Sequence, residues 1–571
     1  MLVLSVGTTS VNVATPRCSW QLVFLIISCL ASAAQPFRPN IVMDIADDLG
    51  WNDVGFHGSD QIPTPNLDAL AYNGVILNNH YVQPQCTPSR AALMTGRYPI
   101  KTGMQGPPLL SAEPRGLPLS YKILPQFMRD LGYSTHAVGK WHLGYYRQAY
   151  TPQFRGFDTH LGYYGGFTNY YDYILQDIYP EGEFTGFDLR RNGSLAYELQ
   201  GRYATDVYTE EAVNLIHSHP VGRPLFLYVA HLAVHAGNRG KLLEAPQEVI
   251  NRFQHIADPQ RRTYAAMVAK LDESVGEIVS ALHRRSMLDN TIIVFMSDNG
   301  APATDNQRPN IGLFPNWGSN YPLRGAKETL WEGGVRSPTF IWSTTFQQNP
   351  RVSTNLMHIT DWLPTLYAAA GGDKYAMPPD IDGVDHWYSL QWKQPSPRKQ
   401  ALLNINERDR NAAIITSYET GISRNTWKMI FGKFKNHEFD EYYQDTKSPT
   451  NPPYNVQEIL ASPAGRALAT LYPPSATDLT IRNLRFEATV NCGIGINYPA
   501  PNCEYRPCLF NLDKDPCERL NVADHNTAIT IQMYNDLRYF RSMLIPQSNR
   551  GPDIYGADPK KWNDTWQSWA L

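Results

Sequence analysis

Cysteine is scarce in this sequence and unevenly distributed. Seven cysteines occur in 571 residues, and Cys86 is the only one between Cys29 and Cys492. A disulfide framework through the long middle of the chain is therefore excluded, and Cys86 has no partner nearby in the sequence. Four cysteines lie close together near the C-terminus and can pair among themselves in three ways: Cys492, Cys503, Cys508 and Cys517.

A strong net charge and long apolar runs are also absent. The formal charge of −3 gives no reason to expect binding to nucleic acid or to an anionic surface. The apolar run from Leu22 to Leu30 is shorter than the roughly 20 residues that span a bilayer. Arg17 precedes this run and small residues follow it, which is typical of a cleaved secretory signal. We therefore expect a signal peptide at residues 1–34, a lysosomal or extracellular protein, and no stable membrane anchor.

The sequence has no internal repeats and no low-complexity tract, and its length suggests two or more domains. Up to about residue 370, apolar runs alternate with helical patterns, which favours an α/β layer structure with a largely parallel sheet. Helices are expected at residues 262–283, where apolar residues keep helical spacing, and at 358–372, which begins near Asp361 and stops at Gly371. The expected sheet strands are residues 40–46, 133–139, 224–230 and 291–297.

The pattern of apolar and polar residues changes after about residue 395. The stretch QPSPRK looks like a linker, and the segments TWKMIFG and CLFNL are typical of short strands. We therefore predict a large domain at residues 38–395 and a smaller α+β domain with a short antiparallel sheet at 396–571. A last helix is expected at residues 527–544, with four residues on one face: Ile531, Tyr534, Leu537 and Phe540.

Each of the four expected strands leads into polar residues at its C-terminal end. In open α/β sheets, ligands bind in the crevice outside these ends, so residues distant in the sequence can meet there. Singly the signals are weak, because Asp-Gly or Asn-Gly after a strand is most often a turn and a lone histidine is more often structural than catalytic. The residues concerned are Asp47, Asp48, Lys140, His142, His231, His235, Asp298 and Asn299.

Together these residues indicate a metal site beside an anion site. Three carboxylates and one amide oxygen form an all-oxygen ligand set, which suits Ca²⁺ or Mg²⁺ better than zinc. Lysines and histidines would be out of place around a metal unless an anion also binds there. The constellation therefore favours a phosphate or sulfate ester as the ligand.

The stretch QCTPSRAALMTGRYPI places Cys86 next to this site. The spacing predicts a short helix with Thr87 as its cap, Pro88 at its first position and Gly96 at its stop. Cys86 would lie just before that helix, where free backbone N–H groups attract anions. The alternative is a buried structural thiol, or a disulfide to the C-terminal cysteines.

The same stretch resembles the signature of the sulfatase family, whose core is Cys-x-Pro-Ser-Arg, with Cys86, Pro88 and Arg90 at its key positions. The resemblance implies an alkaline-phosphatase-like fold, in which a large, mostly parallel mixed sheet is sandwiched by helices and a smaller C-terminal domain follows. Residues 38–395 would then be the catalytic domain. Similarity to arylsulfatases of the B, I and J type extends over nearly the whole mature chain, in ADDLGWNDVGFHGS, VGKWHLG, RGFDTHLGYYGG, SDNGA, PLRGAKETLWEGGVRSP, HITDWLPTL and LFNLDKDP.

The resemblance also explains the isolated cysteine. In this family a formylglycine-generating enzyme oxidises the cysteine to formylglycine in the endoplasmic reticulum, so Cys86 would no longer be a thiol. One Ca²⁺ ion would be bound by the formylglycine oxygen at position 86 and by four side chains: Asp47, Asp48, Asp298 and Asn299.

Five basic residues would act around position 86. The motif implies that Arg90 and Lys140 orient the formylglycine hydrate, and that His235 and Lys327 hold the sulfate and assist the leaving oxygen. One hydroxyl of the hydrate would attack sulfur and displace the alcohol. His142 would then take a proton from the second hydroxyl, so that the carbonyl re-forms and sulfate is released.

The expected activity is that of an arylsulfatase B-like sulfuric ester hydrolase. N-acetylgalactosamine 4-sulfate units of glycosaminoglycans and small dietary or plant sulfates both remain open as substrates. The segment GMQGPPLLSAEPRGLPLS lacks cysteines expected in the vertebrate 4-sulfatase, and the insert DIYPEGEFTGFDLRRNGSLAYELQGRY also differs, as in invertebrate members. His231 has no role in the pattern and is expected to be structural.

Two rival functions remain. A phosphohydrolase of the same superfamily would use Ser or Thr and two zinc ions, and a secreted binding protein would have lost its activity. The cysteine, the oxygen ligand set and the intact motif positions argue against both. Sequons at Asn192 and Asn563 are compatible with glycosylation.

Overall fold

The computed structural model describes residues 38–302, 315–420, 423–471, 476–493 and 498–570, together with Ser5 and Gly7. The predicted signal peptide therefore lies almost entirely outside the described residues. Residues Pro39–Leu571 form one compact unit. No helix in the described ranges is long and apolar enough to cross a membrane.

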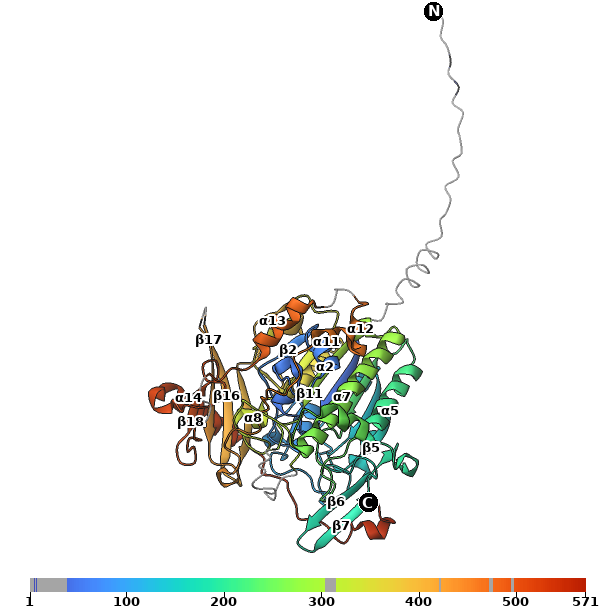
Figure 1. Ribbon diagram of the computed structural model, residues 1–571, viewed down its shortest axis with the longest axis horizontal. Helices are drawn as coiled ribbons and strands as arrows, with labels where there is room; N and C mark the ends of the chain where they lie inside the picture. The colour runs from blue at the N-terminus through green and yellow to red at the C-terminus, as the bar shows by residue number, and fades with distance from the viewer. Residues whose placement is uncertain are drawn as a thin grey trace, which may run out of the picture. The chain divides into compact units, whose positions relative to one another are not determined.

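A ten-stranded mixed sheet runs through this unit (Figure 1). Its centre is parallel: β1 (Asn40–Ala46) lies between β10 (Leu225–Ala230) and β11 (Thr291–Ser297), and β4 (Ser134–Lys140) pairs with β10. These four strands match the predicted ones within one residue at each end. The remaining strands are β5 (Thr159–Tyr163), β8 (Arg190–Arg191) and β9 (Ser194–Leu195) on one side, and β12 (Phe340–Trp342), β2 (Val75–Leu77) and β13 (Arg351–Ser353) on the other.

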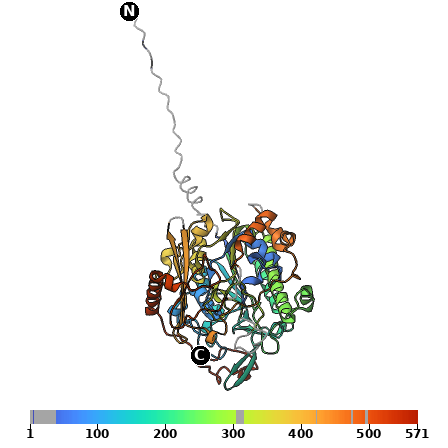
Figure 2. The ribbon, with the colours of Figure 1, turned by 60° about the vertical axis from the view of Figure 1, so that its left-hand side comes forward.

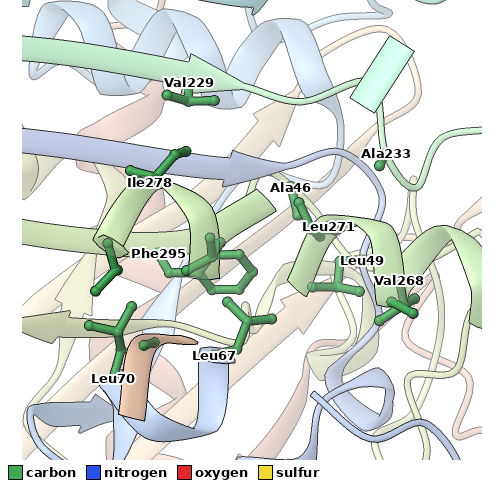
Figure 3. Packing of buried hydrophobic residues seen from close by; sticks show 14 of the residues in the cluster. Ala46, Leu49, Leu67, Leu70, Val229, Ala233, Val268, Leu271, Ile278 and Phe295 are labelled. Atoms are coloured by element: carbon green, nitrogen blue, oxygen red, sulfur yellow. The ribbon is translucent and has the colours of Figure 1, made fainter. Parts of the chain in front are cut away.

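Helices cover both faces of the sheet, because successive strand residues point to opposite sides. Val42 of β1 faces the core beneath one helical layer, whereas Ile41 and Met43 face the other. Figure 3 labels Ile278 of α7 and Phe295 of β11, which both belong to the first core. That layer contains α2 (Pro65–Ala71), α5 (Ala204–Ser218) and α7 (Pro259–Arg284), and the other contains α3 (Cys86–Thr95), α4 (Leu124–Asp130) and α9 (Trp362–Ala369).

A second, four-stranded antiparallel sheet is formed by the C-terminal part of the chain. Its strands are β15 (Gln400–Asn406), β16 (Asn411–Thr420), β17 (Ser423–Phe431) and β18 (Cys508–Asn511). Helix α14 (Thr527–Ser542) packs on its outer face (Figure 2). Together the two sheets and their helices give the fold class expected from the sequence.

Of the four residues predicted to share one face of α14, Leu537 and Phe540 pack against the sheet. Met533 and Leu537 are buried against the sheet, whereas Ile531 is 62% and Tyr534 42% exposed. The predicted set repeats every three residues. A helix turns about 100° per residue, so such a set drifts by about 60° at each step.

The C-terminal part of the chain also returns to the large core. Its helices α11 (Val456–Ala461), α12 (Pro463–Leu468) and α13 (Asp478–Ala488) bury their apolar residues in the same core as α2 and α7. The segment predicted as a linker is anchored, because Arg398 is buried and donates to the carboxylate of Asp361 at 2.7 Å. The domain division near residue 395 stays a prediction.

A last segment, residues 545–570, lies along a loop formed by residues 103–113. Ser548 N donates to Gly103 O at 2.9 Å, and Asp553 N donates to Ala112 O at 2.8 Å. The segment ends against the hairpin of β6 (Ile174–Tyr179) and β7 (Gly182–Phe187), where Trp566 is buried. Residues late in the chain thus support a loop near its beginning.

The structure resolves the cysteine pairing that the sequence left open. Cys492 bonds to Cys517, and Cys503 bonds to Cys508. Cys86 is buried and free.

Candidate active site

Two consecutive carboxylates follow β1 at the end of the central sheet. In an extended strand they would point to opposite faces, but Asp48 has a φ of 63° and so breaks the alternation. The backbone here is fixed on both sides: Asp47 N donates to Ala233 O at 3.0 Å, and Asp47 O accepts from Val234 N at 2.8 Å. Asn316 Nδ2 holds the turn by donating to Asp48 O at 3.0 Å. The strained turn directs both carboxylates into one site.

Asp298 and Asn299, at the end of β11, meet the first pair. Asp48 N donates to Asp298 Oδ1 at 3.3 Å, and Asn299 Nδ2 donates to Asp48 Oδ1 at 2.6 Å. All four side chains are fully or almost fully buried. The four predicted metal ligands form two pairs that lie about 250 residues apart in the sequence. The parallel strands bring these two pairs together.

Three buried cations each pair with a different carboxylate of this cluster. The predicted site had placed these cations at residue 86 and at the sulfate. In the described structure their ion pairs are Arg90–Asp298 at 2.9 Å, Lys140–Asp47 at 2.6 Å and Lys327–Asp48 at 2.6 Å, and their roles at residue 86 and at the sulfate stay predictions.

The pKa values of the two consecutive carboxyls diverge. Burial raises the pKa of Asp47 to about 7, against the opposing effect of Lys140. Burial also raises the pKa of Asp48, but Lys327 and His235 outweigh it and hold the value at about 2. The charge of Asp47 is therefore incompletely compensated by the protein.

The segment that carries Lys327 is fixed in position by contacts with the C-terminal part of the chain. Arg324, three residues earlier, is fully buried and donates to the backbone oxygens of Asp440 at 2.7 Å and Tyr498 at 2.8 Å. On the other side, a Cβ at Gly300 would lie 1.8 Å from a backbone oxygen of this segment. The oxygen is that of Gly333, six residues after Lys327, and only glycine at position 300 permits so close an approach.

Helix α3 begins at Cys86 itself, two residues earlier than the sequence predicted. Pro88 is accordingly its third residue, and Gly96 ends it with a φ of 64°. Thr87 does not cap the helix: its hydroxyl accepts from Leu109 N at 3.1 Å and donates to the backbone oxygen of the residue at position 142 at 3.3 Å. Thr87 therefore joins the helix start to the loop at residues 103–113.

The Cys86 thiol lies inside the site. It is 2% exposed, and its sulfur belongs to a group of buried ligand atoms, from Asp47, Asp48, Cys86 and His235, that all lie within 4.8 Å of one another. Burial raises the pKa of this thiol to about 11, although Lys140 and Lys327 oppose the rise. At neutral pH the thiol is protonated, so the unmodified side chain is a poor nucleophile.

His142 is positioned to accept a proton. Its Nε2 lies 2.9 Å from Leu109 O, a carbonyl that can only accept, so Nε2 carries the hydrogen. Its Nδ1 is buried and has no hydrogen-bond partner among the described residues. Burial and then Lys140 hold the pKa of His142 well below its usual value, so the ring is neutral.

His235 joins the site and His231 does not. His235 Nδ1 donates to Ala236 O at 2.6 Å, and its Nε2 lies 3.5 Å from Asp48 Oδ2. Its ring stacks on Phe167, and burial lowers its pKa to about 3. His231 instead lies beside Asp44, with 3.5 Å between Nε2 and Oδ1.

Comparison with known proteins agrees with this geometry. The profile of the family described as Sulfatase matches residues 39–372. Arylsulfatase J of Mus musculus is 34% identical over 542 residues, covering 94% of this chain and 81% of the relative. The chain belongs to the sulfatase family.

Other sulfatases extend the comparison. N-acetylgalactosamine-6-sulfatase of Mus musculus is 34% identical over 391 residues, covering 64% of this chain and 69% of the relative. The crystal structure of Ps i-CgsB has a TM-score of 0.66 and 28% identity, with 92% of this chain and 97% of that chain covered. This sulfatase is therefore a sulfuric ester hydrolase by family.

The site contains supporting residues that the sequence analysis did not find. Asn316 holds the Asp48 turn, and the Ser89 hydroxyl donates to the backbone oxygen of Asp298. Leu109 contributes only backbone atoms, to Thr87 and His142. The position of Ser89 in the helix motif was a usable signal, whereas Asn316 and Leu109 act through tertiary contacts that leave no local pattern.

The side chains of this sulfatase fit a hard divalent cation. Oδ1 of Asp47 and Oδ1 of Asn299 are buried and accept no hydrogen bond from any described residue. Three carboxylates and an amide oxygen are ligands that Ca²⁺ prefers. A bound cation would also compensate the carboxylate whose pKa burial raises.

Proposed function

We propose that this sulfatase cleaves sulfate esters through a formylglycine at position 86 and one Ca²⁺ ion held by Asp47, Asp48, Asp298 and Asn299. The observation that carries the proposal is Cys86: among the cysteines that the structure describes it alone is free, the four C-terminal ones being paired, and it lies among the carboxylates at the start of α3. As an unmodified thiol with a pKa of about 11, it would contribute little to catalysis.

When present, formylglycine supplies a hydrated aldehyde oxygen as nucleophile and Ca²⁺ stabilises negative charge on the sulfuryl oxygens. The residues of the chain then have separable roles. Lys140 and Arg90 orient the group at position 86, and both are buried and fixed by carboxylates. Because His142 is neutral with a free Nδ1, it can accept a proton from the second hydroxyl at position 86.

Lys327 is the better candidate for protonating the leaving oxygen. Although burial opposes its charge, Asp48 raises the pKa of Lys327 above its usual value, so the ammonium group carries a proton. His235 is neutral, and its hydrogen-bearing Nδ1 donates to Ala236. We therefore assign proton donation to Lys327, and sulfate binding and orientation to His235.

We propose a sulfated saccharide as the substrate. The similar protein Ps i-CgsB has been solved in complex with k-i-k-neocarrahexaose, at 27% identity to this chain. N-acetylgalactosamine-6-sulfatase is among the curated relatives. The 4-sulfate of N-acetylgalactosamine and small dietary or plant sulfates are the two classes to compare first.

We place the protein in the secretory pathway, in the lysosome or outside the cell. Two disulfides in its C-terminal part suit an oxidising compartment. The proposed formylglycine-generating partner would act earlier on this pathway, in the endoplasmic reticulum.

Mass spectrometry of the proteolytic peptide containing residue 86, from protein secreted by a eukaryotic cell, tests the proposal. The expected result is the formylglycine mass, together with calcium-dependent hydrolysis of nitrophenyl sulfate. The Cys86→Ala variant should fold normally and turn over no substrate. An unmodified Cys86 in cells that modify other sulfatases would overturn the proposal.

A further inference from the structure

A hollow of about 230 Å³ lies on the C-terminal sheet, between the β15–β16 turn and α14. We call it the arginine pocket, because three exposed arginines line it: Arg410, Arg538 and Arg541. None of their side chains makes a hydrogen bond or ion pair with any residue in the described ranges. Most exposed arginines of a folded protein are solvated singly, so three without partners around one hollow indicate a site for an anion.

The single carboxylate that lines the pocket does not neutralise these arginines. Glu407 accepts from Gln547 N at 2.7 Å and from Gln105 Nε2 at 3.2 Å, both neutral donors. The nearby carboxylate of Asp536 accepts from Gln400 at 2.7 Å and does not line the hollow. Three positive groups thus face one carboxylate that is already hydrogen-bonded.

Aromatic rings lie beside the charges. Tyr534, Arg538 and Arg541 follow one another at helical spacing and share a face of α14. Tyr534 is 42% exposed and meets Phe431 of β17 edge-on, with 6.3 Å between ring centroids. Ring surface next to guanidinium groups suits a ligand that has both an apolar face and an anionic substituent, as a charged sugar has.

The arginine pocket is connected to the wall of the active site. Glu407, in the pocket, contacts Gln105, and Gln105 is four residues from Leu109, so their Cα atoms are at most about 14 Å apart. Leu109 O receives the hydrogen bond from His142. The arginine pocket therefore lies beside the same loop, residues 103–113, that contacts His142 in the active site.

We propose that the arginine pocket binds an anionic group of a polyanionic saccharide chain whose reacting sulfate lies in the active site. This rests on the proposed function and extends it: the enzyme acts on polymers rather than only on single sulfated sugars. The pocket adds affinity for the chain and takes no part in the chemical step.

Binding is tested in the Cys86→Ala background, where the substrate is not consumed. The double variant R538Q/R541Q should bind a fluorescent chondroitin sulfate decasaccharide at least about tenfold more weakly, since each lost guanidinium contact is charge-assisted. Arg284→Gln is the matched control, because Arg284 is likewise an exposed arginine in the last turn of a helix, α7. An unchanged dissociation constant in the double variant would overturn the proposal.

A second probe distinguishes the anion. An oligogalacturonate, which has carboxylates but no sulfate, is compared with the sulfated chain. Weakened binding of both probes supports a general anion pocket, and weakened binding of the sulfated chain alone supports sulfate recognition. Equal binding of both probes by wild type and double variant rejects the pocket.

Kinetics separate this proposal from the proposed function. In otherwise wild-type protein, R538Q/R541Q should raise KM for the sulfated decasaccharide about tenfold, while kcat and the hydrolysis of nitrophenyl sulfate stay unchanged. A parallel loss with nitrophenyl sulfate would mean a disturbed active site and would overturn a remote pocket. If wild type hydrolyses no sulfate ester, the proposed function fails, and the binding experiment still decides the pocket.

Discussion

At the scale of single residues, the active site is a set of paired opposite charges. Three buried carboxylates each contact a different buried cation. Burying an unpaired charge is costly, so this matching lets ionised groups persist in the interior. A divalent cation and a sulfate ester would enter as a further pair of opposite charges.

The variant Lys327→Gln tests the role of the ammonium group. If Lys327 protonates the leaving oxygen, kcat should fall by about 10²–10⁴ for an alkyl sulfate, the range typical of general acid catalysis. The loss should be smaller for nitrophenyl sulfate, whose leaving oxygen needs little protonation. Steady-state kinetics with both substrates provide the measurement.

Lys101→Gln serves as the control for Lys327, because Lys101 also forms an ion pair with an aspartate, Asp382, at 2.5 Å, and is not one of the active-site residues. It should leave kcat unchanged for both esters. Equal losses for both esters in Lys327→Gln would favour sulfate binding over proton donation.

At the scale of elements, α3 depends on its neighbours for its position. It packs against the short helical turn Ile359–Asp361 at the start of α9. Asp361 there accepts from the backbone of His358 and Val384 at 2.8 Å and from Arg398 at 2.7 Å. A buried ion pair thus stabilises the support beneath the helix that starts at Cys86.

This ion pair should make the free energy of unfolding depend on pH in the acidic range. Although burial opposes ionisation, Arg398 and His386 hold the pKa of Asp361 well below its usual value. The pKa of an aspartate in the unfolded chain is about 4. A group whose pKa is lower in the folded protein stabilises the fold fully at pH values above about 4, and this stabilisation is lost progressively as the pH falls below about 4 toward the pKa in the folded protein. At pH 7, Asp361→Asn should lower the free energy of unfolding by about 3–5 kcal/mol, because Arg398 stays buried without its partner.

Chemical denaturation of wild type and Asp361→Asn between pH 7 and pH 3 provides the measurement. The difference in unfolding free energy should narrow as the pH falls below about 4. A difference that stays constant over this range would mean that Asp361 acts through its hydrogen bonds alone.

The segment that carries Lys327 offers a second test at this scale. Replacing Arg324 by methionine removes donors to the backbone oxygens of Glu518, Asp440 and Tyr498. We expect kcat to fall by about tenfold or more, since small displacements of catalytic groups are costly. In Arg351→Met, which also removes an arginine bound to backbone oxygens, stability should fall without this loss of kcat. Similar kcat values in both variants would contradict a positioning role for Arg324.

The central strands were predictable because each is a short apolar run that ends in polar residues. Strands of two or three residues, such as Arg190–Arg191 and Phe340–Trp342, are too short to give a periodic signal. The start of α3 was misplaced by two residues because Thr87, a typical cap, forms tertiary hydrogen bonds instead. Local propensity thus determined where elements lie, and tertiary contacts determined their ends.

In the active site, too, the sequence predicted what depends on local pattern and missed what depends on tertiary contacts. The positions after the strand ends could be predicted from the sequence, because parallel strands bring their carboxyl ends together. The pairing of Lys140 with Asp47 and of Lys327 with Asp48 could not, because it depends on distances between segments far apart in the chain. The support of Asp48 by Asn316 was missed for the same reason.

At the scale of the whole molecule, the two disulfides should differ in their effect. Cys492–Cys517 spans 25 residues and Cys503–Cys508 spans 5. The loop-entropy model predicts losses of about 3.5 and about 2 kcal/mol when each pair is replaced by serines. Denaturant titration of the two double variants gives the comparison, and a larger loss for the shorter loop would contradict the model.

The contact between residues 545–570 and the loop at 103–113 has a consequence for the timing of biosynthesis. That loop covers the start of α3 through Leu109 and Thr87, and Ser548 and Asp553 hold it in place. At 5–20 residues per second, a ribosome adds Asp553 roughly 25–90 s after Cys86. During that interval the nascent chain lacks the segment that holds this cover, so the proposed formylglycine-generating enzyme would have a window for reaching residue 86 that is set by the speed of translation.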